Sequence, residues 1–449
     1  MYWFSRVFKL IVFLLIVFVI SHYAIVFLDS LLLGDRAPYF QQQTDNSIII
    51  RWQSDHHAMG VVRYGEQPDY LESLKLEESA VKKHSIKILG LKPDTRYYYK
   101  AGDIDGFIEG NHHKNWFRTA PLPGTRRATR IWVIGDSGVP GKTARQVRNA
   151  MYQWVYKHPR KGLPPADVWL GLGDFAYPSG TNDQFQAALF DTYPDLLSNT
   201  VLWPVYGNHD ARRWTYFKLF DLPEKAEAGG VASHTENYYA FDYGDSHFVM
   251  LDSTASSMQP GSDMLNWLQR DLAHNKRSWV IAALHHPPYT KGSHDSDKPH
   301  DSGGRMIKVR EHILPILEKA GVDVVLAGHS HDYERSYLLD CAYRSSKFFS
   351  RKNIVSHGIH GKNHDFIKPA GNVPHQGAIY VVAGSSSQVG QGPLNHPANV
   401  VGLKQAGSLI IDINGNTLVG HFINNRGKEM DTFSIRKQAG YKSGYAGCR

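Results

Sequence analysis

Cysteine is scarce in this sequence of 449 residues, which contains only Cys341 and Cys448. The two do not form a closely spaced pair, and this argues against a metal site built on sulfur ligands. A dense disulfide framework is excluded as well, although an oxidising compartment would permit one disulfide between them. Any metal bound by this chain has to be held mainly by oxygen and nitrogen atoms.

Long runs of one charge are also missing. The formal net charge is +8 and the isoelectric point about 9.1, but the lysines and arginines are scattered along the chain. Without a basic tract, binding to nucleic acid is not expected. The positive balance instead favours attraction to anionic substrates or to an anionic envelope surface.

A long apolar segment covers residues 8–28, and about 20 such residues are enough to cross a bilayer as a helix. Arg6 and Lys9 at its start favour a cytoplasmic N-terminus, with the remaining chain outside the cytoplasm. A cleaved signal peptide is the main alternative, but no small-x-small cleavage pattern follows. A buried helix of a cytosolic protein is a third. We expect residues 1–30 to form a transmembrane anchor of a periplasmic or extracellular protein, which would be secreted if the segment were cleaved.

Residues 38–120 contain short β-branched and aromatic segments separated by turn signals, a pattern typical of a β-sandwich. The Leu-x-Pro-x-Thr-x-Tyr pattern over residues 91–97 resembles that of fibronectin type III modules. We therefore expect an all-β, fibronectin III-like domain over this range. Residues 121–124 form a stiff Pro-Leu-Pro-Gly linker, and a second domain is expected over residues 127–449.

From residue 130 apolar runs alternate with amphipathic stretches, which is typical of α/β folds. Strands are expected over residues 131–134, 168–172, 201–205, 247–251, 279–284, 322–326, 378–382, 408–412 and 417–420. Helices are expected over residues 142–157, 181–190, 262–274 and 305–320. Asn414-Gly415 predicts a hairpin turn. The polar residues 341–377 are expected to form a long surface loop near the functional site.

Five short motifs follow the expected strands. They are Gly135-Asp136-Ser137-Gly138, Gly173-Asp174-Phe175-Ala176-Tyr177, Gly207-Asn208-His209-Asp210, His285-His286 and Gly328-His329-Ser330-His331. Because ligands gather at the carboxyl ends of strands in α/β sheets, we expect the motifs to form one site. Their oxygen and imidazole donors suit iron, zinc or manganese. The donors are numerous enough for two metals that share a ligand.

This ordered set of motifs resembles that of the metallophosphoesterases, and within them that of the purple acid phosphatases, over residues 38–436. Common metallophosphoesterases have a metal-binding histidine where this chain has Gly138. Purple acid phosphatases instead have a tyrosine three residues after the bridging aspartate, as Tyr177 stands after Asp174. The resemblance implies a metallophosphoesterase β-sandwich flanked by helices. It also leads us to expect that Gly138→His would partly replace the ligand lost in Tyr177→Phe.

The resemblance further implies two sets of metal ligands that share one bridging aspartate. The first metal would be held by Asp136, Asp174, Tyr177 and His331. The second would be held by Asp174, Asn208, His285 and His329. A tyrosine phenolate is best stabilised by a trivalent cation, so Fe³⁺ with a divalent iron, zinc or manganese ion is expected. His285 is preferred over the adjacent His286, which would support the ligands.

Two more histidines are implied in catalysis. His209 would contact the substrate phosphate or orient the nucleophile, with bracing of a ligand as the alternative. His294 would protonate the leaving group, with a solvated loop histidine as the alternative. The implied activity is hydrolysis of phosphate monoesters of small molecules, of the acid phosphatase type, by a metal-bridging hydroxide. The enzymatic alternative is a phosphodiesterase or nucleotide pyrophosphatase that uses the same metals. The non-enzymatic alternative is a surface-binding protein with a relic phosphatase domain.

We expect the full-length protein to fractionate with membranes, because the apolar segment over residues 8–28 is uninterrupted. A truncated protein that begins at Leu31 should be soluble and active. Cell fractionation followed by immunoblotting would compare the two. Sequencing a mature N-terminus that begins after residue 28 would contradict an uncleaved anchor.

Overall fold

The computed structural model describes residues 6, 8–14, 16–17, 34–104, 106–108, 114–212, 214–445 and 447. Within these residues, no helix combines the length and the apolar character needed to cross a bilayer. Residues 8–14 and 16–17 are helical and exposed, but most of the predicted anchor over residues 8–28 lies outside the described residues.

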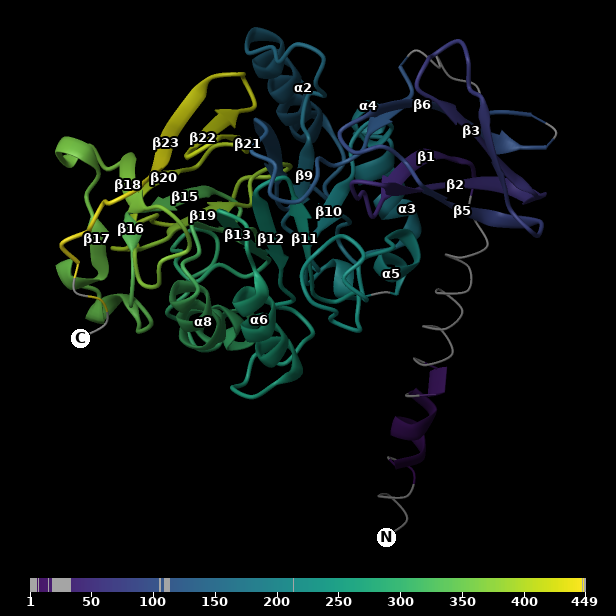
Figure 1. The fold of residues 1–449 in the computed structure, drawn as a ribbon. Coiled ribbons are helices and arrows are strands. Elements are labelled where there is room, and N and C mark those ends of the chain that lie inside the picture. The colour runs from purple at the N-terminus through teal and green to yellow at the C-terminus, as the bar shows by residue number, and fades with distance from the viewer. Residues whose placement is uncertain are drawn as a thin grey trace.

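The N-terminal part of the chain forms two small antiparallel sheets, on the right of Figure 1. One sheet has the order β1-β2-β5 and consists of Arg36–Gln41, Ser47–Ala58 and Val81–Leu89. The other has the order β4-β3-β6-β7 and consists of Ser73–Leu76, Gly60–Gly65, Arg96–Asp103 and Trp116–Arg118. Buried aromatic residues of both sheets form the core of this part of the chain. Phe40 on β1 and Tyr99 on β6, for example, have ring centroids 5.1 Å apart. The arrangement is the all-β one expected from the sequence.

Buried contacts join this N-terminal module to the rest of the protein. The Tyr39 hydroxyl donates a hydrogen bond to the carbonyl of Leu219 at 2.8 Å, and its ring meets Phe190 edge-on. Arg36 donates to Asn182 at 2.9 Å and also lies over the Phe190 ring. The aromatic clusters on both sides form one continuous core. Removing the module would therefore expose apolar surface on its neighbour.

The larger part of the chain is built on two seven-stranded sheets. The first has the order β10-β9-β8-β21-β22-β23-β18 and comprises Leu202–Pro204, Val168–Gly171, Thr129–Ile134, Gly407–Asn414, Thr417–Asn424, Glu429–Gln438 and Asp365–Pro369. The second has the order β11-β12-β13-β14-β19-β15-β20 and comprises Tyr239–Tyr243, Ser246–Met250, Trp279–Leu284, Val324–Ala327, Ile379–Ala383, Tyr333–Ser336 and Asn399–Leu403. In the first sheet β8, β9 and β10 are parallel, and in the second β12, β13, β14 and β19 are parallel. Their carboxyl ends therefore lie at one edge of each sheet.

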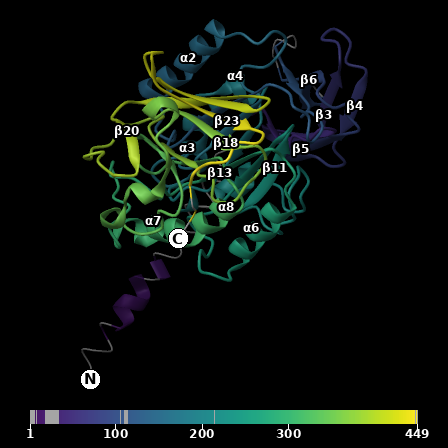
Figure 2. The same cartoon turned by 60° about the vertical axis from the view of Figure 1, so that its left-hand side comes forward.

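Helices cover the outer faces of the sheets, with α2 on one side and α6 and α8 on the other (Figures 1 and 2). The helices are α2 (Lys142–Lys157), α3 (Asn182–Phe185), α4 (Pro194–Leu197), α5 (Thr215–Leu219), α6 (Asp263–His274), α7 (Arg305–Lys308) and α8 (Leu314–Lys319). Buried residues of α2 recur at helical spacing, as Ala144, Val147, Met151 and Trp154 show, and pack towards β21 and β22. The α/β sandwich flanked by helices thus agrees with the fold class expected from the sequence.

The expected helices over residues 142–157 and 262–274 are present, and the other two contain π-helical turns at Gln186–Phe190 and Val309–Ile313. The expected surface loop near the site over residues 341–377 is wrong. This segment contains β17 (Ile354–Ser356), which pairs with β16 (Leu338–Leu339), and it also contains β18. Alternating burial around Phe366 lets β18 join the outer edge of the first sheet beside β23.

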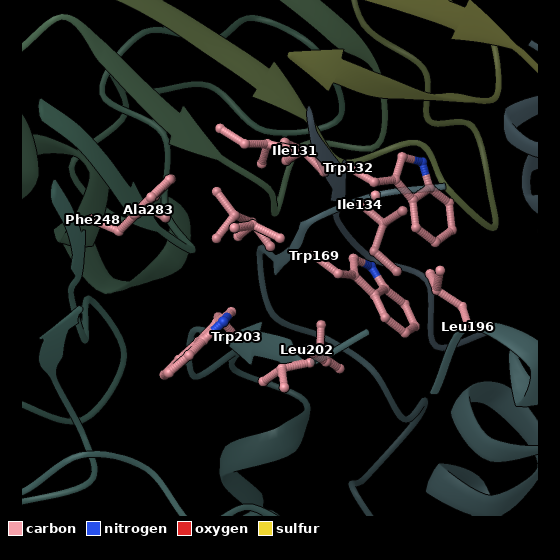
Figure 3. Packing of buried hydrophobic residues seen from close by; sticks show 14 of the residues in the cluster. Ile131, Trp132, Ile134, Trp169, Leu196, Leu202, Trp203, Phe248 and Ala283 are labelled. Atoms are coloured by element: carbon pink, nitrogen blue, oxygen red, sulfur yellow. The ribbon is translucent and has the colours of Figure 1, made fainter. Parts of the chain in front are cut away.

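Large buried aromatic residues pack on both faces of the first sheet (Figure 3). Trp132 on β8 stacks with Trp169 on β9 at 5.2 Å, and Trp203 on β10 stacks with Phe241 on β11 at 3.9 Å. All four are at most 1% exposed. This packing fixes the strands against one another, and with them the loops that leave their carboxyl ends.

His247 on β12 is buried between two carboxylates. Its Nδ1 lies 2.7 Å from Asp242, and its Nε2 lies 2.7 Å from Asp271 at the end of α6. Burial lowers the pKa of His247, but the hydrogen bonds to the two aspartates outweigh this and raise it to about 9. The imidazolium therefore ties α6 to the second sheet.

We expect His247→Gln to lower the free energy of unfolding at pH 6. A folded pKa of about 9 against an ordinary value of 6.5 corresponds to roughly 3 kcal/mol. Because the folded pKa is the higher one, this stabilisation is complete below about pH 6.5 and is lost as the pH rises through 9. Urea unfolding at pH 6 and pH 9.5 would measure it, with the exposed His274→Gln as control. An equal loss at both pH values would contradict this role.

Candidate metal centre

The predicted ligands lie beyond the carboxyl ends of β8, β9 and β10 in the first sheet and of β13 and β14 in the second. They are Asp136, Asp174, Tyr177, Asn208, His285, His329 and His331. Hydrogen bonds cross from one sheet to the other here: His285 Nδ1 donates to the carbonyl of Leu172 at 2.8 Å. The structure therefore brings all seven residues together where the ends of both sheets meet.

Three of these residues have left-handed backbone conformations. The φ angles are 54° at Asp136, 57° at Asp174 and 67° at His329, a region that residues other than glycine seldom occupy. Hydrogen bonds support this conformation: the Asp136 amide donates to the carbonyl of Gly173 at 3.1 Å. The His329 amide donates to Asp136 Oδ2 at 2.7 Å. Strained residues that are held in this way are typical of functional sites.

The four residues expected at the first metal converge on the Tyr177 hydroxyl. This oxygen lies 3.0 Å from Asp136 Oδ1, 3.0 Å from Asp174 Oδ2 and 3.1 Å from His331 Nε2. Burial and the two carboxylates raise the pKa of Tyr177 far above its usual value. The phenol of Tyr177 therefore keeps its proton unless a highly charged cation displaces that proton.

The residues expected at the second metal converge on His285. Its Nε2 lies 2.9 Å from Asn208 Oδ1, 3.2 Å from His329 Nδ1 and 3.4 Å from Asp174 Oδ2. Burial lowers the pKa of His285, but the carboxylates of Asp174 and Asp136 outweigh this and raise it to about 9. Nδ1 donates to the carbonyl of Leu172, so Nε2 is the nitrogen that faces the other donors. Asp174 Oδ2 also accepts from Tyr177, so this carboxylate belongs to both clusters.

The adjacent His286 has different surroundings. Its Nδ1 lies 2.9 Å from the hydroxyl of Ser253, and its ring packs 4.4 Å from that of His329. Burial and the neighbouring His285 hold the pKa of His286 well below its usual value. A neutral, buried ring that supports His329 agrees with the role preferred for it, although its nitrogen lies within 4.8 Å of those of His285 and His329.

His209 and His294 each lie against one member of the ligand cluster. The ring of His209 lies 4.3 Å from that of Tyr177, and its Nδ1 is 2.8 Å from the carbonyl of Pro178. The ring of His294 stacks at 3.9 Å on His329. Because Nδ1 of His209 is hydrogen-bonded to Pro178, Nε2 is the nitrogen of this ring that can bind another molecule. The His294 side chain is 31% exposed, so it can meet a molecule from solvent.

Asp301 and Asp210 contribute to the site, although neither was assigned a role in the sequence analysis. Asp301 Oδ1 lies 2.8 Å from His294 Nδ1 and orients that ring. Asp210 is fully buried, and its carboxylate accepts hydrogen bonds from the amides of Asp174, Phe175 and Gly207 at 2.7, 2.9 and 3.3 Å. The position of Asp210 at the end of the Gly-Asn-His-Asp motif was a signal; Asp301 had none.

The expectation that Gly138→His would replace a ligand is wrong. A Cβ atom at Gly138 would lie 2.5 Å from the amide nitrogen of Ala176 and 2.7 Å from the carbonyl oxygen of Asp174. The Gly138 amide also donates to that carbonyl at 3.0 Å. The two loops are therefore too close for any side chain at this position.

The donor set fits a pair of metal ions. Two carboxylates, one amide, one phenol and three imidazoles face a common centre, and most of them are buried. Buried carboxylates and histidines at such distances are stable when they are paired or bind cations. Metals of intermediate hardness prefer this mixture of oxygen and nitrogen donors.

Two family models match the chain. The calcineurin-like phosphoesterase model matches residues 129–333, and the model of the purple acid phosphatase N-terminal domain matches residues 38–119. The chain thus combines a purple acid phosphatase N-terminal domain with a calcineurin-like phosphoesterase region. The family resemblance inferred from the motifs is confirmed.

The chain is similar to several plant purple acid phosphatases. Purple acid phosphatase 21 of Arabidopsis thaliana is 29% identical over 302 residues, which are 63% of this chain and 61% of that protein. The probable purple acid phosphatase 20 of the same plant is 30% identical over 268 residues, 56% of this chain and 55% of that protein. The matches thus span less than two thirds of these relatives.

Solved structures share the fold. A purple acid phosphatase from yellow lupin seeds has a TM-score of 0.69 at 16% identity, covering 90% of this chain and 75% of that one. The structure of PhoD has a TM-score of 0.61 at 11% identity, covering 91% of this chain and 93% of that one. The metallophosphoesterase fold with its N-terminal β domain is thereby confirmed.

We expect Asp210→Asn to lower the metal content of this protein at least twofold. An amide has only one acceptor oxygen, so its NH₂ group would face amides that now donate to the carboxylate. Metal analysis of the purified protein would measure the loss. Asp183→Asn, at an exposed position in α3, is the control. Full metal content in Asp210→Asn would show that the loops hold their positions without it.

Proposed function

We propose that this protein hydrolyses phosphate monoesters at a binuclear metal centre. The observation that carries the proposal is the position of Asp174, whose Oδ2 lies 3.0 Å from the Tyr177 hydroxyl and 3.4 Å from His285 Nε2. One carboxylate between two donor clusters is suited to bridge two cations. The match to the purple acid phosphatase N-terminal domain and the similarity to purple acid phosphatase 21 support the same activity.

We infer that the first cluster takes Fe³⁺ and that the second takes a divalent iron, zinc or manganese ion. The support is Tyr177, whose pKa is raised by burial and by Asp136 and Asp174. A trivalent cation competes with the phenolic proton more strongly than a divalent one does. When bound, the two metals would activate a water molecule and neutralise the charge on the phosphoryl oxygens.

The chain's own residues would then act around the substrate. His209, held at Nδ1 by Pro178, would bind a phosphoryl oxygen through Nε2. His294 would donate a proton to the leaving alcohol, and Asp301 would stabilise the imidazolium that makes this donation possible. The aspartates and histidines of the cluster would keep the reacting groups aligned.

We further infer that the catalytic domain works outside the cytoplasm, attached to a membrane by the N-terminal apolar segment. Cys341 is disulfide-bonded, which favours an oxidising compartment. The remaining cysteine of the sequence, Cys448, lies outside the described residues. The fractionation experiment on the truncated protein tests the attachment.

We expect the protein loaded with iron and zinc to hydrolyse p-nitrophenyl phosphate faster than bis(p-nitrophenyl) phosphate. Chelation should abolish the activity, and returning the metals should restore it. Faster turnover of the diester would favour a phosphodiesterase. Full metal occupancy without any esterase activity would favour a surface-binding protein.

Two variants serve as controls for the metal assignment. The oxidised protein should be pink to purple, and Tyr177→Phe should remove the colour while Asp136 and His331 still hold some iron. Activity should fall further in Asp174→Asn, because that residue lies between both clusters. Absorption spectra and steady-state kinetics would compare them. A colourless and fully active wild type that carries only divalent metals would contradict the ferric assignment.

A further inference from the structure

A cleft of about 700 Å³ opens beside the metal centre. Its walls come from four segments: the start of α2, the loop between β19 and β20, the loop between β20 and β21, and the turn between β22 and β23. Residues that define its chemistry are Thr143, Gln388, Lys404, Arg426, Lys428 and Met430.

Strand register places this cleft at the metal-binding edge of the first sheet. Leu409 near the start of β21 pairs with Val133 near the end of β8, two residues before the loop that carries Asp136. Gly407 pairs with Asn424, so the turn that follows β22 lies at the same edge. In Figure 1, α2 lies beside β21 and β22.

A short chain of contacts connects the cleft to the predicted ligands. Gln388, which lines the cleft, has its Nε2 3.3 Å from His331 Nε2. The amide of Gly390 donates to the His331 carbonyl at 2.7 Å. The Ser386 amide donates to the carbonyl of Gly135, and its hydroxyl donates to Gly407. One side chain therefore separates the cleft from the first metal cluster.

The charge that lines the cleft is positive. Lys404, Arg426 and Lys428 are exposed, and none forms an ion pair with a carboxylate among the residues described. No carboxylate lines the cleft. The nearby acids are engaged elsewhere: Glu429 lies 3.1 Å from His421, and Asp431 pairs with Arg335. Cations left without partners beside a catalytic centre favour an anionic ligand.

The wall that carries two of these cations is held in place. Asn424 Oδ1 accepts hydrogen bonds from the amides of Arg426 and Lys428, both at 3.0 Å. The Asn425 side chain donates to Gln146 of α2 at 3.0 Å, which ties the turn to the helix. The first turn of α2, which includes Thr143, contains no acidic residue. A helix N-terminus adds a further partial positive charge to this side of the cleft.

We propose that this cleft binds a second phosphate group of the substrate, so that the enzyme prefers small molecules carrying two or more phosphates. The inference rests on the proposed phosphatase function, because it assigns the reacting phosphate to the metal centre. Lys404, Arg426 and Lys428 bind the non-reacting phosphate. Gln388 lies between the two phosphates, and Met430 contacts the organic part that joins them.

The test compares 1,6-hexanediol bisphosphate with hexyl phosphate, which differ by the second phosphate. The wild type should have a higher kcat/KM for the bisphosphate, and the preference should weaken at high salt. In a triple variant with Lys404→Gln, Arg426→Gln and Lys428→Gln, KM for the bisphosphate should rise about tenfold, as expected from the loss of three partly exposed charge contacts. Turnover of p-nitrophenyl phosphate should stay within about twofold, because the metal cluster is unchanged.

Lys276→Gln is the matched control, because this exposed lysine precedes β13 at the opposite end from the metal ligands. Equal effects of both variants on the bisphosphate, or no preference for it in the wild type, would overturn the proposal. Binding to phosphatidylserine vesicles that depends on the three cations, with an unchanged bisphosphate KM, would assign them to a membrane surface and also overturn it. If the metal-loaded wild type did not hydrolyse p-nitrophenyl phosphate at all, that result would instead contradict the phosphatase function.

Discussion

The buried carboxylate of Asp210 holds the site together. It accepts amide hydrogens from Asp174 and Phe175 in one loop and from Gly207 in another, so the turns after β9 and β10 form one rigid unit. Because Asp174 is held there with a left-handed backbone, its side chain can reach both donor clusters. Buried hydrogen bonds of this kind are costly to lose, since each unpaired amide would remain away from water. The proposed chemistry therefore requires this unit, because it positions the ligands that would hold the metals.

The carboxyl ends of two sheets supply the rest of the centre, and this could be predicted from the sequence. Each motif follows an apolar strand, and parallel strands bring their ends to one edge. The packing of Trp203 on Phe241 of the second sheet helps to determine how far apart those ends lie. Helices over residues 142–157 and 262–274 were equally predictable, because their apolar residues recur with helical period.

Other features required coordinates. The strand β18 could not be found, because the polar composition of residues 341–377 hides the alternation around Phe366. Asp301 lies seven residues from His294, and no local pattern joins them. The cluster of Lys404, Arg426 and Lys428 depends on the pairing of β21 with β22, whereas the sequence shows only scattered charges. Such contacts arise from tertiary packing, which a motif does not encode.

The contact between Gly138 and the loop that follows Asp174 limits how this family could have diverged. A side chain at position 138 would collide with backbone atoms of Asp174 and Ala176. A centre that uses a histidine there must therefore have its two loops further apart, so exchanging one ligand for the other is not a matter of two substitutions.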